Sequence, residues 1–371
     1  MRKNKIMRSF FKFIPLLLFV ALPRPVQSIS DKRDKVIVDQ LLKGQEYLLR
    51  RHYDDALRIF ASLKKEFPNS PAGYFGEMAS FQIKMLETES FELEEAFKVV
   101  SKQGEKAVAF VMQRYQPSAQ ELMLAASFYG LLGFAQARHE RWISAYFLGT
   151  KSQQIFRRLK REYPNFHDAD FGIGMYLYWK SVFADRLPFI PFISDRRKEG
   201  EALVQNAQNK GWMTRELAGI NLGTIALEEK RYPEAVKIFS DFLTQYPHNL
   251  LLRSFLGRTS LAMQQYKKAE EEFRKTLVVD ASYAKGIYFV AISLLFQEKP
   301  ALLSEAEQHL RHFLELRATD EWKSFAHYWL GVIEEKRGDM GKAKDEYERA
   351  LALNPKLKQA TFRIRGLGGG L

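Results

Sequence analysis

Two stretches of this 371-residue chain are copies of one another. Residues 222–239 read LGTIALEEKRYPEAVKIF, and residues 256–273 read LGRTSLAMQQYKKAEEEF. The Leu-Gly pair, the tyrosine, the alanine and the phenylalanine all recur at an offset of 34 residues. A fixed period of this length indicates a chain built from stacked copies of one small unit and not around a single central core.

The remaining sequence has a helical pattern. Apolar residues recur at three- and four-residue spacing almost throughout, and no long alternating strand pattern is present. Proline cannot continue a helix, because it lacks the amide donor and its ring collides with the preceding turn. Clusters of turn residues therefore separate successive helical hairpins, and the sequence predicts about eight of them. These clusters are Phe67-Pro68-Asn69, Tyr163-Pro164-Asn165, Tyr246-Pro247-His248-Asn249 and Asn354-Pro355.

The C-terminal half resembles the tetratricopeptide repeat. Units 216–249 and 250–283 abut, unit 284–323 carries six extra residues around Pro300, and unit 324–357 restores the full pattern. In that last unit, Leu330-Gly331, Ala343 and Tyr347 stand in the repeat's columns. The resemblance implies an all-α, right-handed superhelical solenoid of antiparallel helix hairpins.

The N-terminal half, residues 29–215, is a divergent version of the same repeat. Residues 37–70 fit one unit, residues 71–118 form a hairpin with an acidic linker from Glu87 to Glu95, and residues 119–164 form another. Residues 165–215 combine Gly172-x-Gly174-x-Tyr176 with an Asp195-Arg196-x-x-x-Gly200 motif. That combination resembles exported bacterial repeat proteins and, more distantly, repeat proteins of the inclusion-body-clearance type, which supports family membership only. Residues 358–371 are expected to be a short basic cap and a disordered glycine-rich tail.

The N-terminus predicts export. A basic start, an apolar run over residues 13–23 and small residues before position 29 are typical of a secretory signal peptide, here residues 1–28. The alternative is a retained anchor, but eleven residues are too few for a span of about 20. The chain has no cysteine, so it has no disulfide and no lipidation site after the run. We expect a periplasmic or cell-envelope protein of a Gram-negative-like bacterium.

The charge of the chain is basic. The formal net charge is +13, and removal of residues 1–28 would take six basic residues and lower it to +7. Residual basicity suits an anionic surface such as a phospholipid headgroup layer, or is ordinary solvated charge. No compact basic and aromatic cluster points to a nucleic-acid partner.

The sequence gives no support for an enzyme, a cofactor or a metal site. Gly172-Ile173-Gly174 lacks the third glycine and the preceding strand of a dinucleotide fingerprint, so close helix packing explains it better. His309, His312 and Glu305 could offer metal ligands, but solvated side chains are the simpler interpretation. His167-Asp168-x-Asp170 suits helix capping. No nucleophile-elbow, phosphate-loop or zinc-protease motif is present, and a hydrolase within residues 119–215 stays a less favoured alternative.

A binding groove is the favoured site. The family resemblance implies that the second, fifth, ninth, twelfth and thirteenth residues of each first helix line a concave surface. Aromatic and aliphatic groups with an occasional arginine suit peptide recognition, whereas the same residues could instead pack against adjacent helices. The candidates for protein binding are Leu217, Ile220, Leu251, Arg258, Tyr288, Phe296, Phe325 and Tyr328, and Lys285 occupies another of these places.

The ligand and the function follow from these candidates. The Lys-and-Asn pair by which some relatives clamp a C-terminal carboxylate is absent, which favours an apolar or amphipathic segment over an acidic tail. The sequence therefore predicts a non-enzymatic scaffold that binds another protein in this groove, with Arg258, Tyr288 and Tyr328 contributing most. The alternative is a membrane-associated assembly factor that uses the apolar loop 187–193 through Phe189, Ile190 and Phe192. The same loop could instead be buried at an irregular junction.

Overall fold

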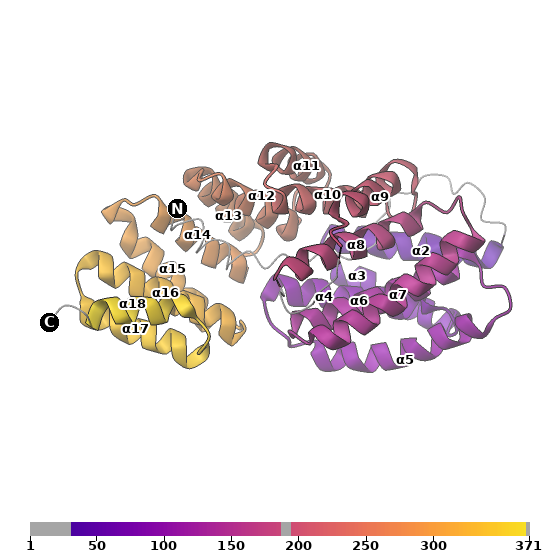
Figure 1. The fold of residues 1–371 in the computed structure, drawn as a ribbon, viewed down its shortest axis with the longest axis horizontal. Coiled ribbons are helices and arrows are strands. Elements are labelled where there is room, and N and C mark those ends of the chain that lie inside the picture. Colours follow the sequence, from indigo (N-terminus) through magenta and orange to yellow (C-terminus); the bar gives the residue numbers. More distant parts are fainter. Residues whose placement is uncertain (1–30, 187–193, 369–371) are drawn as a thin grey trace. The chain divides into compact units, whose positions relative to one another are not determined.

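The computed structural model describes residues 31–186 and 194–368. Within them the chain forms seventeen α-helices and one short 3₁₀ helix, with no strand (Figure 1). The all-α prediction and the helix-hairpin architecture are confirmed. The predicted signal peptide 1–28 and the loop residues Phe189, Ile190 and Phe192 lie outside the described residues.

The described chain divides into two compact units. The N-terminal unit contains residues 31–83, 93–186 and 194–238, and the C-terminal unit contains residues 84–92 and 239–368. The boundary near residue 238 lies inside a helix, whereas the sequence predicted that divergent repeats give way to regular repeats at residue 215. A short segment from the first half of the sequence, residues 84–92, thus belongs to the C-terminal unit.

The helices of the first half follow one another as hairpins. Helices of a hairpin, such as α6 with α7 and α8 with α9, pack along their length, and successive hairpins contact through pairs such as α7 and α8. The helices are α2 (Lys32–Leu49), α3 (Tyr53–Glu66), α4 (Pro71–Thr88), α5 (Glu94–Gln113), α6 (Ala119–Arg138), α7 (Trp142–Glu162), α8 (Asp168–Arg186), α9 (Arg197–Lys210), α10 (Arg215–Glu228) and α11 (Tyr232–Gln245).

The second half continues the pattern with one irregular repeat. The connection between α14 and α15 contains the 3₁₀ helix η1, and α16 begins at Asp320, four residues before the repeat boundary at 324. The six extra residues of unit 284–323 are therefore shared between a longer turn and a longer following helix. The helices are α12 (Leu250–Ala262), α13 (Tyr266–Val279), α14 (Ala284–Phe296), η1 (Pro300–Leu302), α15 (Leu303–Glu315), α16 (Asp320–Arg337), α17 (Met340–Leu353) and α18 (Lys358–Gly368).

The C-terminal tail differs from the sequence expectation. Residues 366–368 were expected to be disordered with the rest of the glycine-rich end, but α18 continues to Gly368. Ala360 is buried in the apolar cluster of the C-terminal unit, and Ile364 and Leu367 pack against that cluster. Burial of this apolar face stabilises the helix and offsets the low helix propensity of its glycines.

A glycine in the first helix against a ring in the second helix sets the spacing of several hairpins. A Cβ atom added to Gly257 would lie 2.7 Å from the ring of Phe273, and one added to Gly331 would lie 2.6 Å from the ring of Tyr347. Gly44 makes the same approach to the ring of Phe60. Because no side chain separates the helix backbone from the ring, the two helices pack closely.

The divergent segment 165–215 is held by glycine contacts of another kind. A Cβ atom on Gly174 would lie 2.5 Å from the carbonyl oxygen of Gly200, and one on Gly200 would lie 2.6 Å from that of Gly174. Backbone thus meets backbone between α8 and α9. Gly172 lies against the ring of Phe156. These contacts confirm the packing interpretation of Gly172-Ile173-Gly174, and they account for the glycines of the Gly-x-Gly and Asp-Arg-x-x-x-Gly motifs.

Asp168 connects two hairpins. Its Oδ1 accepts hydrogen bonds from the backbone N–H of Trp212 at 3.0 Å, the backbone N–H of Thr214 at 2.8 Å and the Thr214 hydroxyl at 2.9 Å. The carboxylate therefore binds the start of α10, 46 residues along the chain from its own helix. Burial raises the pKa of Asp168, against the opposing effect of these donors.

The glycine–ring contact predicts the effect of one methyl group. Gly331→Ala should destabilise the protein by about 1–3 kcal/mol, because its Cβ would overlap the Tyr347 ring. Gly341→Ala in α17 is the matched control, since its nearest neighbour is 3.6 Å away and alanine favours a helix by up to about 1 kcal/mol. Thermal unfolding followed by circular dichroism should show a lower midpoint for Gly331→Ala and an equal or higher one for Gly341→Ala. Equal midpoints for both variants would contradict the packing account.

The raised pKa of Asp168 predicts a pH dependence. The folded state favours the protonated acid, so the stability that Asp168 contributes is present at low pH and is lost as the pH rises through its folded pKa. Asp168→Asn keeps the accepting oxygen but does not titrate. Urea unfolding at pH 7.5 and pH 5.0 should therefore show the wild type gaining stability relative to Asp168→Asn at the lower pH. A constant difference, or one of opposite sign, would be incompatible with this.

Candidate functional site

The structure encloses most of the predicted groove residues. Leu217 and Ile220 of α10 are fully buried, and Leu251, Phe325 and Tyr328 are buried as well. In this structure their side chains offer little surface to another molecule. Helices α10 and α14 are buried on nearly every side, because each first helix packs against its own partner and against the neighbouring hairpins. Their role in binding stays a prediction.

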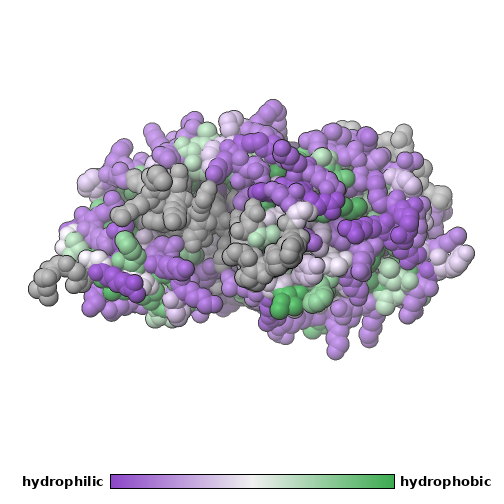
Figure 2. Space-filling model, in the orientation of Figure 1, coloured by the Kyte–Doolittle hydropathy of each residue, from purple (hydrophilic) through white to green (hydrophobic). Residues whose placement is uncertain are grey.

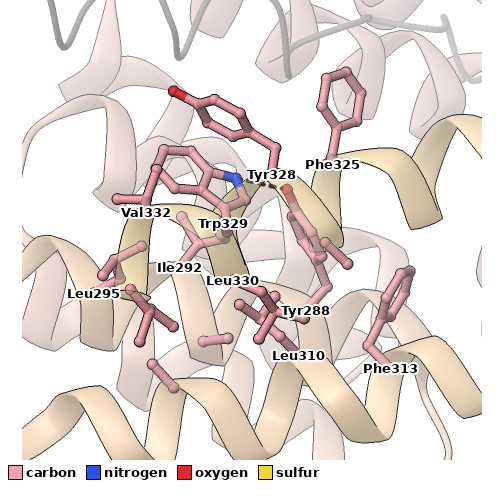
Figure 3. Close-up of a cluster of buried hydrophobic side chains, with 14 of the residues drawn as sticks. Tyr288, Ile292, Leu295, Leu310, Phe313, Phe325, Tyr328, Trp329, Leu330 and Val332 are labelled. Carbon is pink, nitrogen blue, oxygen red and sulfur yellow. Dashed lines mark hydrogen bonds between the residues drawn. The ribbon is translucent and has the colours of Figure 1, made fainter. Parts of the chain in front are cut away.

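Tyr288 and Tyr328 belong to an aromatic cluster in the C-terminal unit (Figure 3). The indole N–H of Trp329 donates to the Tyr288 hydroxyl at 3.0 Å, and Tyr288 is completely buried. Burial raises the pKa of Tyr288 well above its ordinary value. The ring of Tyr328 packs edge-on against Trp329, and its hydroxyl points away from Tyr288 (Figure 3). Both tyrosines thus support the repeat from inside.

Two of the eight groove candidates keep partial exposure. The guanidinium of Arg258 lies 5.9 Å from the centre of the Phe255 ring, and Phe296 lies against Tyr266 and the edge of Trp329. Phe296 therefore rests on the same cluster that contains Tyr288. Of the predicted set, Arg258 and Phe296 are placed to touch a ligand without rearrangement of the core.

The first turn of α14, the helix that ends at Phe296, binds another segment of the chain itself. We call residues 84–92, KMLETESFE, the docked segment; it comprises the last turn of α4 and the acidic residues after it. The ammonium of Lys285, in the first turn of α14, donates to the carbonyl oxygen of Leu86 at 2.6 Å and contacts Glu89 Oε1 at 2.5 Å. Lys285 thus binds both the end of a helix and the carboxylate that follows it.

The connection between α15 and α16 adds two further contacts. The backbone N–H of Thr319 donates to the carbonyl oxygen of Glu89 at 3.0 Å, and the guanidinium of Arg317 pairs with Glu92. Glu89 has a left-handed backbone, with φ of 51°, which turns the chain directly after the helix. Met85, Leu86 and Ser90 of the docked segment are buried. We call Lys285, Arg317 and Thr319 the docking surface.

The sequence indicated the separate parts of this site, but it did not predict that the acidic linker and Lys285 are in contact. Lys285 stood at a groove position and the acidic linker was recognised, yet the pair is separated by about 200 residues. The periodicity of apolar residues indicates only local structure, so it could not predict a contact between residues so far apart in the sequence.

A second surface lies on α7 in the N-terminal unit. Ile143 and Phe147 are 76% and 66% exposed, and Trp142 and Tyr146 beside them are also exposed. Apolar residues elsewhere on the visible face form small patches on a largely hydrophilic surface (Figure 2). Large exposed side chains at positions one and four residues apart form one continuous apolar face on the first turns of α7.

A cavity of about 290 Å³ adjoins this face between α7 and α8. Its lining includes Tyr146, Arg157, Tyr176 and Lys180, and the Lys180 ammonium lies 5.7 Å and 5.6 Å from the centres of the Tyr146 and Tyr176 rings. Neither Lys180 nor Arg157 forms an ion pair within the described residues. The cavity is therefore cationic and aromatic.

The described residues contain no group of three or more histidine, aspartate or glutamate side chains placed to hold a metal ion. His309 lies 3.9 Å from Glu305, and His312 is exposed. Among the helices of residues 31–186 and 194–368, none combines the length and the hydropathy needed to cross a membrane.

Comparison with known proteins identifies the repeat. Models of the tetratricopeptide repeat match residues 226–283 and 324–357. Superkiller complex protein 3 of Mus musculus is 26% identical over 139 residues, which cover 37% of this chain and only 8% of that protein.

Two solved structures match this chain at low sequence identity. The hetero-tetramer Cut9–Hcn1 of the APC/C is 13% identical, with a TM-score of 0.60 over 88% of this chain and 55% of that one. PilF of Pseudomonas aeruginosa is 16% identical, with a TM-score of 0.46 over 66% of this chain and 97% of that one. The repeat models and the packing of the described helices as hairpins agree, so the chain contains tetratricopeptide repeats over residues 226–283 and 324–357.

Proposed function

We propose that this tetratricopeptide repeat protein is a non-enzymatic scaffold of the bacterial cell envelope, and that it binds a segment of another protein on the first-helix face of its C-terminal unit. Proteins of this family in general bind other proteins or peptides. The observation that carries the proposal for this chain is the docked segment, because Lys285 of the first helix α14 and Thr319 of the connection before α16 already bind a stretch of polypeptide distant in sequence.

The proposal divides the predicted groove residues into two roles. Arg258 and Phe296 contact the ligand, since their side chains reach the surface. Tyr288 and Tyr328 hold that surface in place, because Phe296 rests on Trp329 and Trp329 is hydrogen-bonded to Tyr288. Replacing the tyrosines with alanine would damage the core by about 3–5 kcal/mol each, so they cannot report on binding.

Binding of this kind requires no covalent chemistry. Apolar contact with Phe296 supplies affinity, and donors such as the Arg258 guanidinium fix orientation. A hydrolase within residues 119–215 stays the less favoured alternative. Residues 1–28 support the proposed export, because a basic start followed by a short apolar run is typical of a secretory signal peptide.

Site-specific photo-crosslinking in the native cell tests the proposal. A photoreactive phenylalanine derivative at position 258 should give a discrete adduct with one partner protein, recovered in the fraction released by osmotic shock. The same residue at position 278 is the matched control, because Val278 is 87% exposed on α13 and lies outside the proposed site. Adducts of the same size and yield from both positions, or none from position 258, would contradict binding on this face.

A second candidate function is attachment to the membrane surface, favoured by the exposed face of α7. Trp142, Ile143, Tyr146 and Phe147 are apolar or amphipathic residues, and tryptophan and tyrosine are enriched at membrane interfaces. Lys180 and Arg157 in the adjoining cavity suit anionic headgroups. Phe189, Ile190 and Phe192, which lie outside the described residues, stay the candidates that the sequence offers for membrane contact.

Vesicle flotation separates this candidate from the scaffold. Wild type should float with vesicles that contain phosphatidylglycerol, whereas Ile143→Asp/Phe147→Asp should stay in solution, because a buried charge opposes insertion. Phe189→Asp/Phe192→Asp tests the loop in the same assay. Val278→Asp is the control for an exposed apolar residue elsewhere and should float as the wild type does. Equal flotation of every variant would remove both surfaces from consideration.

A further inference from the structure

We infer that the docking surface of Lys285, Arg317 and Thr319 is a recognition site for acidic helix ends, occupied in this chain by its own residues 84–92, and that a partner segment of the same chemistry binds by displacing them. This inference rests on the proposed scaffold function and specifies the partner and its control.

The first support is the chemistry of the contact with the helix end. The last four carbonyl groups of an α-helix lack partners within the helix and carry a partial negative charge. The Leu86 carbonyl oxygen is one of these in α4, and the ammonium of Lys285 donates to it. The same ammonium contacts the Glu89 carboxylate. The surface therefore recognises a helix terminus and a following acid together, which a solvated lysine would not do.

The position of Lys285 provides the second support. It lies in the first turn of α14, where the helix dipole disfavours a cation. It is also only 9% exposed, and a buried ammonium is expensive unless it is paired. The charge of Lys285 is thus unfavourably placed with respect to the dipole of its own helix. The Leu86 carbonyl oxygen and the Glu89 carboxylate of the docked segment offset the cost of burying this ammonium.

Charge complementarity between the docked segment and the docking surface provides the third support. The docked segment contains three glutamates and one lysine, and the docking surface contributes a lysine and an arginine. The Glu92–Arg317 pair is exposed, so it adds orientation more than affinity. The backbone bond from Thr319 to Glu89 is independent of side chains and requires only that the chain turn after its helix, as it does at Glu89. The partner that fits is a protein helix ending in an acidic turn.

This site differs from the carboxylate clamp that the sequence lacks. That clamp uses the fifth and ninth places of the first helix, whereas Lys285 stands at the second place of unit 284–323. The docking surface therefore binds an acidic ligand through the carbonyl groups at the end of the ligand's helix and through a glutamate side chain, and not through a C-terminal carboxylate.

The test uses the full chain and a peptide of residues 71–92, blocked at both ends and labelled with fluorescein. Glu89→Gln/Glu92→Gln in the chain weakens the docked segment, so this variant should bind the wild-type peptide at least tenfold more tightly than the wild-type chain does. Adding Lys285→Met should abolish that gain, and if this variant fails to fold, Arg317→Gln should reduce it. Glu95→Gln, which alters an exposed acid paired with Lys98, is the control and should bind as the wild type does.

Three outcomes would overturn the inference. The wild type and all variants could bind the peptide with the same affinity. The higher affinity of Glu89→Gln/Glu92→Gln could also persist when Lys285→Met or Arg317→Gln is added. Alternatively, light scattering could show a wild-type dimer that the Glu89 and Glu92 substitutions dissociate, in which case a second copy supplies the segment. If the peptide binds as expected but the crosslinking experiment gives no adduct from position 258, the docking surface is supported and the scaffold proposal fails. The reverse pattern would retain the scaffold and remove this site.

Discussion

The approach of a glycine to an aromatic ring within several hairpins is the constraint on which the other features depend. Gly257 meets Phe273 and Gly331 meets Tyr347 at distances that leave no room for a methyl group. The contact fixes how near the two helices lie, and the rings then fill the space that the next hairpin would otherwise leave empty. Aromatic stacking continues this order into the neighbouring repeat, where the Phe273 ring lies parallel to that of Phe289 at 4.9 Å. Stability is thus built from repeated local contacts.

Such close packing determines which residues can bind anything. When the hairpins approach this closely, the first helices α10 and α14 are covered on almost every side, and residues such as Ile220 and Tyr288 become core. The binding chemistry of the C-terminal unit is therefore left to the few side chains at the margins of these helices, among them Arg258, Phe296 and Lys285. A surface of this kind recognises a ligand with few contacts, so its specificity depends on charge and backbone geometry more than on apolar area.

The sequence predicted the repeating part of the fold well, because the 34-residue period and the proline-containing turns are local signals. It predicted the packing role of Gly172 and Gly174 for the same reason. It could not separate groove residues from core residues, since a position such as Tyr288 has the same spacing in either case. The helical character of residues 366–368 was missed because burial of Ile364 and Leu367 outweighs a composition that favours disorder. The docked segment was beyond reach, because it joins residues about 200 positions apart.

The irregular repeat explains why the docking surface lies where it does. In unit 284–323 the extra residues lengthen the turn before α15, and α16 begins four residues before the repeat boundary. Four residues extend a helix by about 6 Å, or roughly one turn. The connection that carries Arg317 and Thr319 is therefore displaced by one turn relative to its place in a regular repeat, and it is this displaced connection that contacts Glu89 and Glu92. The departure from periodicity and the contacts of Arg317 and Thr319 with the docked segment thus occur in the same unit.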